Sequence, residues 1–97
     1  METPIVYMLR CADGTLYTGW TVNLQRRLVQ HNRGIASKYT RARLPVVVVY
    51  QEPADSRRQA LQRERAIKKL SRQAKEALLL HHGPMRLRNS AKRSVGT

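Results

Sequence analysis

Cysteine is nearly absent from this sequence, because Cys11 is the only one among 97 residues. A single cysteine excludes a disulfide framework within the chain and any zinc site built from cysteine pairs. No apolar run is long enough for a membrane-spanning helix, and we find no lipidation signal. The N-terminal segment lacks the basic region of a secretory signal. We therefore expect a cytoplasmic protein without a membrane partner.

Acidic residues are also scarce. Six Asp and Glu residues stand against 19 Lys and Arg residues, which gives a net charge of +13. Such a charge attracts polyanions, so we expect a nucleic-acid partner, DNA first and RNA as the alternative, with binding that weakens as salt rises. A structural protein on ribosomal or other RNA would carry the same charge, and that class stays open.

We also expect neither internal repeats nor a second domain. Apolar residues make up 41% of the chain, which suits one compact domain with a modest core. The last residues contain Gly, Pro and Ser without a core pattern. We predict one domain over residues 1–80 and a basic, disordered tail over 81–97.

The apolar pattern predicts an α/β chain of the α+β type, in which helices flank a three-stranded antiparallel sheet. Strands are expected near residues 4–11, 14–21 and 45–51, and helices near 23–33, 56–70 and 72–80. Val46 to Tyr50 is a continuous apolar run, which predicts a strand covered on both faces. Residues 35–45 between the first helix and this strand are expected to form a basic loop.

The turn between the first two strands decides where two tyrosines point. A two-residue Asp13-Gly14 loop would place Tyr7 and Tyr17 on opposite faces of the sheet. A three-residue loop over 12–14, with Gly14 in the left-handed conformation, would place both on one face. We favour the three-residue loop, because glycine suits its third position.

Polar residues on two helical stripes are the candidate site. Leu24, Leu28 and His31 share one stripe, and Arg27 lies at its edge, where it either joins the tyrosines or extends its charged head into water. On the later helix Glu64 falls among apolar residues, and a buried carboxylate needs a partner or a cation. Either Lys68 pairs with it at i+4 or it binds a metal; we favour the metal, because Lys68 should project away from the stripe.

These residues together resemble the GIY-YIG endonuclease superfamily, in particular its small stand-alone bacterial members. The two strand motifs that name the family read here Ile5-Val6-Tyr7 and Tyr17-Thr18-Gly19. Arg27 and His31 match its helical Arg and the residue one turn later, and Glu64 matches its metal ligand. The resemblance covers residues 4 to 80. Two positions depart from the pattern: Ile5 replaces a glycine, and Trp20 stands where the excision-repair type carries lysine.

The resemblance implies a metal-dependent endonuclease that hydrolyses phosphodiester bonds in DNA, including structured or damaged DNA in repair. One Mg²⁺ or Mn²⁺ would bind Glu64, Arg27 would contact the phosphate, and Tyr7 or Tyr17 would accept a proton with help from His31. A phenol is a poor base unless Arg27 or the metal lowers its pKa. The alternative is a non-catalytic nucleic-acid-binding module with the same fold. Candidate nucleic-acid contacts, which can equally be solvated side chains, are Lys38, Tyr39, Arg41, Arg43 and Lys68.

Overall fold

The computed structural model describes residues 3–82 of the chain. Its strands are β1 (Ile5–Arg10), β2 (Leu16–Thr21) and β3 (Val47–Pro53). They form one antiparallel sheet in the order β2-β1-β3. The three-stranded antiparallel sheet flanked by helices is therefore confirmed.

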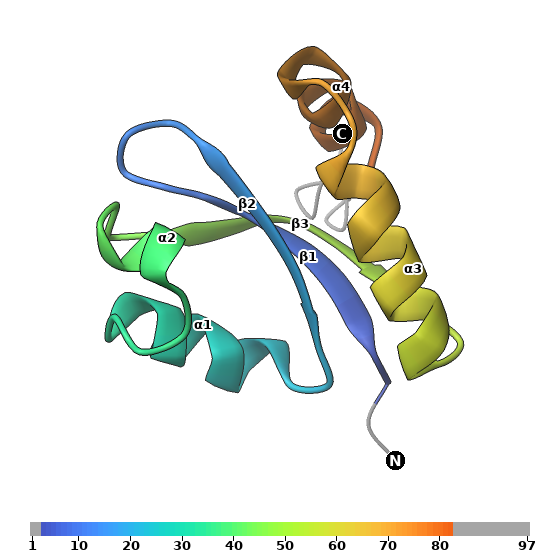
Figure 1. The fold of residues 1–97 in the computed structure, drawn as a ribbon, viewed down its shortest axis with the longest axis horizontal. Coiled ribbons are helices and arrows are strands. Elements are labelled where there is room, and N and C mark those ends of the chain that lie inside the picture. Colours follow the sequence, from blue (N-terminus) through green and yellow to red (C-terminus); the bar gives the residue numbers. More distant parts are fainter. Residues whose placement is uncertain (1–2, 83–97) are drawn as a thin grey trace, which may run out of the picture.

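Within residues 3–82, four helices cover the sheet: α1 (Leu24–Asn32), α2 (Lys38–Arg41), α3 (Arg57–Lys68) and α4 (Arg72–His82). Figure 1 shows α1 and α2 on one side of the sheet and α3 and α4 on the other. The three expected helices are confirmed, with each end within two residues of its predicted position. The segment 35–45 is not wholly a loop, because the short helix α2 forms there. The Ser37 hydroxyl starts α2 by accepting hydrogen bonds from the backbone N–H groups of Tyr39 and Thr40.

The strand covered on both faces is β1, and the prediction that assigned this role to the valine run is wrong. Val6, Tyr7, Met8 and Leu9 of β1 are at most 1% exposed, whereas Val47 of β3 is 55% exposed. A continuous apolar run indicates burial but does not tell which strand is central. Here β1 pairs with both neighbours, so β3 is an edge strand.

Alternate residues of β1 supply two separate cores. Val6 and Met8 pack with α3 and α4, where Ala60 and Ile67 are fully buried. Tyr7 and Leu9 face the other way, and their cluster includes Leu24 and Leu28 of α1. The sheet thus separates a mainly apolar core around Val6 and Met8 from a core that contains the polar candidate residues.

The turn between β1 and β2 is the three-residue loop that we favoured. The Cys11 N–H donates to the Thr15 carbonyl over 2.9 Å, and Leu9 pairs with Tyr17. Gly14 has a φ of +87°, which is the left-handed region that favours glycine. Both tyrosines consequently lie on the face that packs against α1.

The chain after α4 was expected to be a basic tail over 81–97. The helix reaches His82, two residues beyond its predicted end, and the rest of that prediction lies outside the described residues. Among residues 3–82 there is no helix long and apolar enough to cross a membrane.

Candidate active site

A buried chain of hydrogen bonds links β1, α1 and α2. The Tyr7 hydroxyl lies 2.9 Å from His31 Nε2, and His31 Nδ1 lies 2.9 Å from the Thr40 hydroxyl. His31 and Thr40 are fully buried, and Tyr7 is 1% exposed. Thr40 also donates to the Ser37 carbonyl, which leaves its oxygen to accept the proton of Nδ1. The contacts favour the tautomer in which Nε2 accepts the hydrogen bond from the Tyr7 hydroxyl.

The two titratable groups of this hydrogen-bond chain, Tyr7 and His31, are both neutral at pH 7. Burial raises the pKa of Tyr7 to about 12, although the nearby Arg27 guanidinium acts in the opposite direction. Burial, with a smaller contribution from the positive charge of Arg27, lowers the pKa of His31 to about 4. Arg27 therefore does not by itself turn Tyr7 into a base at neutral pH.

The buried His31 should make the protein less stable in mild acid. In the unfolded chain its pKa is near the ordinary 6.5, so between pH 6.5 and about 4 the unfolded state binds more protons. The free energy of unfolding should fall by about 3 kcal/mol across this window. Denaturant titrations at several pH values measure it. His31→Gln should show a weaker dependence of stability on pH than wild type. The carboxylates titrate equally in both proteins, so their contribution cancels in the comparison. An equal pH dependence in both proteins would contradict the lowered pKa of His31.

Gly19 gives the Tyr7 ring its space. The two residues face each other across β1 and β2. A Cβ atom at position 19 would stand 2.7 Å from the Tyr7 hydroxyl oxygen and 2.8 Å from Cζ, closer than van der Waals contact allows. The glycine of the second strand motif is thus required by the buried phenol of the first.

Gly19→Ala should displace Tyr7 and weaken its bond to His31. We expect a loss of about 1–3 kcal/mol in the free energy of unfolding, the usual cost of overpacking a core. The double variant with Tyr7→Phe removes the nearest clashing atom, so it should be more stable than the sum of the single variants predicts. Strict additivity in denaturant titrations would show that the clash is relieved elsewhere.

Arg27 lies where α1 meets the sheet, beside the Tyr7 phenol. Its Nη1 donates to Gln30 Oε1 over 3.2 Å, and its buried Nε has no hydrogen-bond partner among the described residues. A buried donor without a partner is costly and is uncommon away from functional sites. Gln30 therefore holds one part of the guanidinium, while the half-buried side chain also lines an open pocket that an anion can enter.

Glu64 approaches the same place from α3. Its side chain is 14% exposed, and its charge acts on the Tyr7 phenol. Lys68 does reach it, with Nζ 3.4 Å from the carboxylate oxygen, so our expectation that Lys68 projects away is wrong. The same ammonium lies 6.0 Å from the centre of the Tyr17 ring.

Tyr17 is half-buried and joins the two sides of the site. Its ring packs edge-on against His31 at 5.1 Å and stacks against Tyr39 at 6.1 Å. It also lines a surface pocket together with Lys68 and Lys75. Tyr17 is thus the phenol of the pair that reaches the surface, whereas Tyr7 is enclosed.

The predicted nucleic-acid contacts divide into two groups. Tyr39 and Lys68 adjoin Tyr17, as described. Arg43 is held by an ion pair of 3.1 Å to Asp13 and lies 3.9 Å above the Tyr39 ring, so it supports that ring. Lys38 and Arg41 are exposed on α2, and no described contact brings either to Tyr17.

Sequence reasoning missed two residues of this site. Thr40 had no distinguishing pattern within the basic segment 35–45, and its hydrogen bond to His31 depends on helix α2, which we did not predict. Gly19 could have been predicted, because the three-residue hairpin pairs it with Tyr7. A glycine opposite a buried tyrosine indicates that the ring occupies the space of the missing side chain.

Oxygen donors are the metal ligands that this site offers. Residues 3–82 contain no group of three or more His, Cys, Asp or Glu side chains able to share an ion. Glu64 supplies one carboxylate near the Tyr7 phenol. Such a set fits Mg²⁺ or Mn²⁺, which bind through one or two carboxylates, waters and a phosphate, and does not fit a structural zinc or calcium cage.

Comparison with known proteins agrees with this geometry. The model of the GIY-YIG catalytic domain matches residues 3–77. This chain belongs to the GIY-YIG family. Its two motif tyrosines are the pair placed on one face by the hairpin, and the motif glycine is the one against the Tyr7 ring.

Relatives of this GIY-YIG chain occur in several different organisms. A UPF0213 protein of Halobacterium salinarum is 52% identical over 73 residues, which cover 75% of this chain and 95% of the relative. One from Streptococcus agalactiae is 48% identical over 77 residues, 79% of this chain and 88% of the relative. The solution structure of a UPF0213 protein from Bacillus halodurans is 36% identical with a TM-score of 0.56, covering 94% of this chain and 99% of that chain.

Proposed function

We propose that this protein is a metal-dependent endonuclease that hydrolyses phosphodiester bonds in DNA, with Mg²⁺ or Mn²⁺ as a single ion, in the cytoplasm. The observation that carries the proposal is that the Tyr17 phenol, the Arg27 guanidinium and the Glu64 carboxylate all lie close enough to the Tyr7 phenol to act on its pKa. They come from β2, α1 and α3 respectively. Binding of the phosphate backbone needs cations, and a carboxylate at the site would oppose it.

Glu64 is the proposed metal ligand. A bound Mg²⁺ or Mn²⁺ would neutralise charge on the phosphate and help a water molecule to lose a proton. Lys68 would leave the carboxylate in that state, and its ammonium is then available to a phosphate oxygen. Separating this ion pair costs little, because i,i+4 ion pairs are worth a few tenths of a kcal/mol.

Tyr17 is the proposed group that accepts the proton of the attacking water. It lines the surface pocket, whereas Tyr7 is enclosed and has a pKa of about 12. The water oxygen forms a bond to phosphorus and its proton passes to the Tyr17 oxygen, while the hydroxyl's own proton passes to solvent at the surface pocket. The bond from phosphorus to the leaving oxygen breaks, and the leaving oxygen takes a proton from solvent. Tyr7 and His31 are then positioning residues, since their bond fixes the packing of Tyr17 and Arg27.

Arg27 is proposed to bind the phosphate. Its guanidinium can donate two hydrogen bonds to phosphate oxygens, and these strengthen as negative charge grows in the transition state. The hydrogen bond to Gln30 and the packing of α1 hold it ready before the substrate arrives.

A nicking assay on supercoiled and on single-stranded DNA tests the proposal. Wild type should cleave with Mg²⁺ or Mn²⁺, and chelator should stop it. Binding without cleavage on any of these DNA forms, with either metal, would favour the alternative, a non-catalytic nucleic-acid-binding module. The same assay on RNA tests the second possible substrate.

A further inference from the structure

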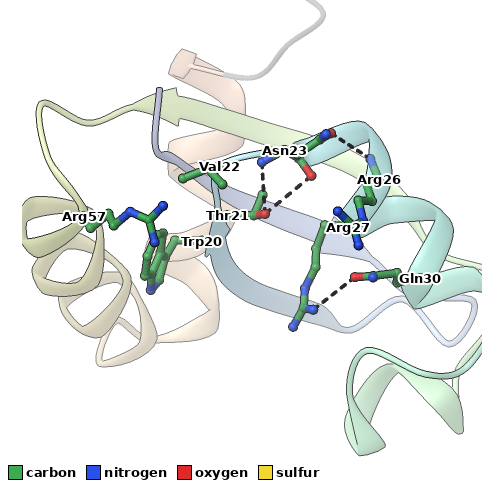
Figure 2. A pocket seen from close by; sticks show the side chains of 8 residues that line it. All are labelled: Trp20, Thr21, Val22, Asn23, Arg26, Arg27, Gln30 and Arg57. Carbon is green, nitrogen blue, oxygen red and sulfur yellow. Dashed lines mark hydrogen bonds between the residues drawn. The ribbon is translucent and has the colours of Figure 1, made fainter. Parts of the chain in front are cut away.

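A second pocket opens on the other side of Arg27, where β2 ends and α1 begins. It has a volume of about 300 Å³, the lower end of the range for pockets that hold small ligands. α1 contributes Arg26, Arg27 and Gln30, and Figure 2 shows these facing Trp20 of β2 and Arg57 of α3 across the opening. The pocket therefore brings together residues from both layers of helices.

The pocket is strongly positive. Three arginines line it and none of its lining residues is acidic. The ion pairs within residues 3–82 use other cations: Arg10, Arg43, Arg63, Lys68 and Arg72. The pocket arginines thus keep their charge available, and an anion is the ligand that this lining favours.

Trp20 gives the pocket an aromatic wall. It is half-buried, because one part of it packs against the core around Val6 and Met8 and another part lines the pocket. An aromatic surface beside arginines is the combination on which nucleotides bind, with the base stacked and the phosphate paired. An inorganic anion would need only the arginines.

We propose that this pocket is a nucleotide subsite next to the reacting phosphate: the base of the neighbouring nucleotide stacks on Trp20, and its phosphate binds Arg26 and Arg57. Arg27 borders both the pocket and Tyr7, so the two sites are adjacent. This inference rests on the proposed function for its substrate class. A base inside a duplex cannot stack on a protein ring, so the nucleotide at this position must be unpaired or turned out of its helix.

Trp20 is the only tryptophan, so its fluorescence reports directly on this pocket. The probes are a short single-stranded oligonucleotide and an abasic oligomer with the same number of phosphates, both without metal. The oligonucleotide should change Trp20 emission and bind about 5- to 150-fold more tightly than the abasic oligomer. Equal affinity with equal emission would overturn the stacking.

Trp20→Leu distinguishes stacking of the base on Trp20 from stacking on Tyr39. Leucine removes the aromatic ring but keeps an apolar side chain toward the core. The preference for the base-containing strand should shrink in this variant. An unchanged preference would overturn the assignment to Trp20.

Arg57→Gln and Arg58→Gln test the phosphate contact as a matched pair, since both residues are exposed on the first turn of α3 and only Arg57 lines the pocket. Arg57→Gln should lower the log–log salt slope of binding by about 0.7, the value for one contact on a single strand, and Arg58→Gln should lower it by less. Equal slopes would overturn the contact. These binding measurements need no cleavage. A wild type that binds with base preference but does not cleave would defeat the proposed function alone. A wild type that cleaves but shows no base preference would defeat the subsite alone.

Discussion

Glu64→Gln should nearly abolish metal-dependent cleavage while binding of DNA without metal stays equal or becomes slightly tighter. Glutamine keeps the shape of the side chain but loses the charged ligand. One negative charge also leaves a site that meets phosphate. Stability should change by only a few tenths of a kcal/mol, because the ion pair with Lys68 is of the weak i,i+4 type.

Asp55→Asn is the matched control, since it removes the same charge from an exposed position on the segment before α3. Cleavage rates and affinities of both variants should be measured in one preparation. Cleavage that survives in Glu64→Gln would remove the metal-ligand assignment.

Arg27→Ala is expected to lower the rate of cleavage by about 10²–10³, the effect of losing one preorganised donor, with little change in ground-state binding.

Tyr17→Phe should slow cleavage by about 10²–10⁴, the range for a lost general base, and leave the melting temperature nearly unchanged. Tyr7→Phe should behave differently. It removes the hydrogen-bond partner of buried His31 Nε2, which costs about 1–3 kcal/mol of stability. Its rate should fall less than that of Tyr17→Phe.

The two tyrosine variants are each other's control, because each loses one hydroxyl from the same cluster. Single-turnover rates and thermal unfolding should be compared side by side. A larger rate loss in Tyr7→Phe, at a temperature where both variants are folded, would move the proton acceptor to Tyr7. It would also mean that the buried phenol becomes accessible when DNA binds.

Local chemistry explains why so much of the fold could be predicted. Gly14 determined the three-residue turn, and that turn determined the register that places Tyr7 and Tyr17 on one face. Asn23 and Ser56 start α1 and α3 by accepting backbone hydrogen bonds within a few residues. Each of these effects acts over three to ten residues, so the pattern of side chains contains it.

The sequence by itself determined the strands and main helices, the motif spacing that marks the GIY-YIG family, and the positive charge. Only the tertiary structure decided which strand is central, because a run of valines is equally apolar in a central strand and in an edge strand. It also decided that Tyr7 is enclosed beside His31, and that Trp20 and Arg57 face Arg26 across one pocket. Burial and contacts between distant elements depend on how whole layers pack, and no short stretch of sequence contains that information.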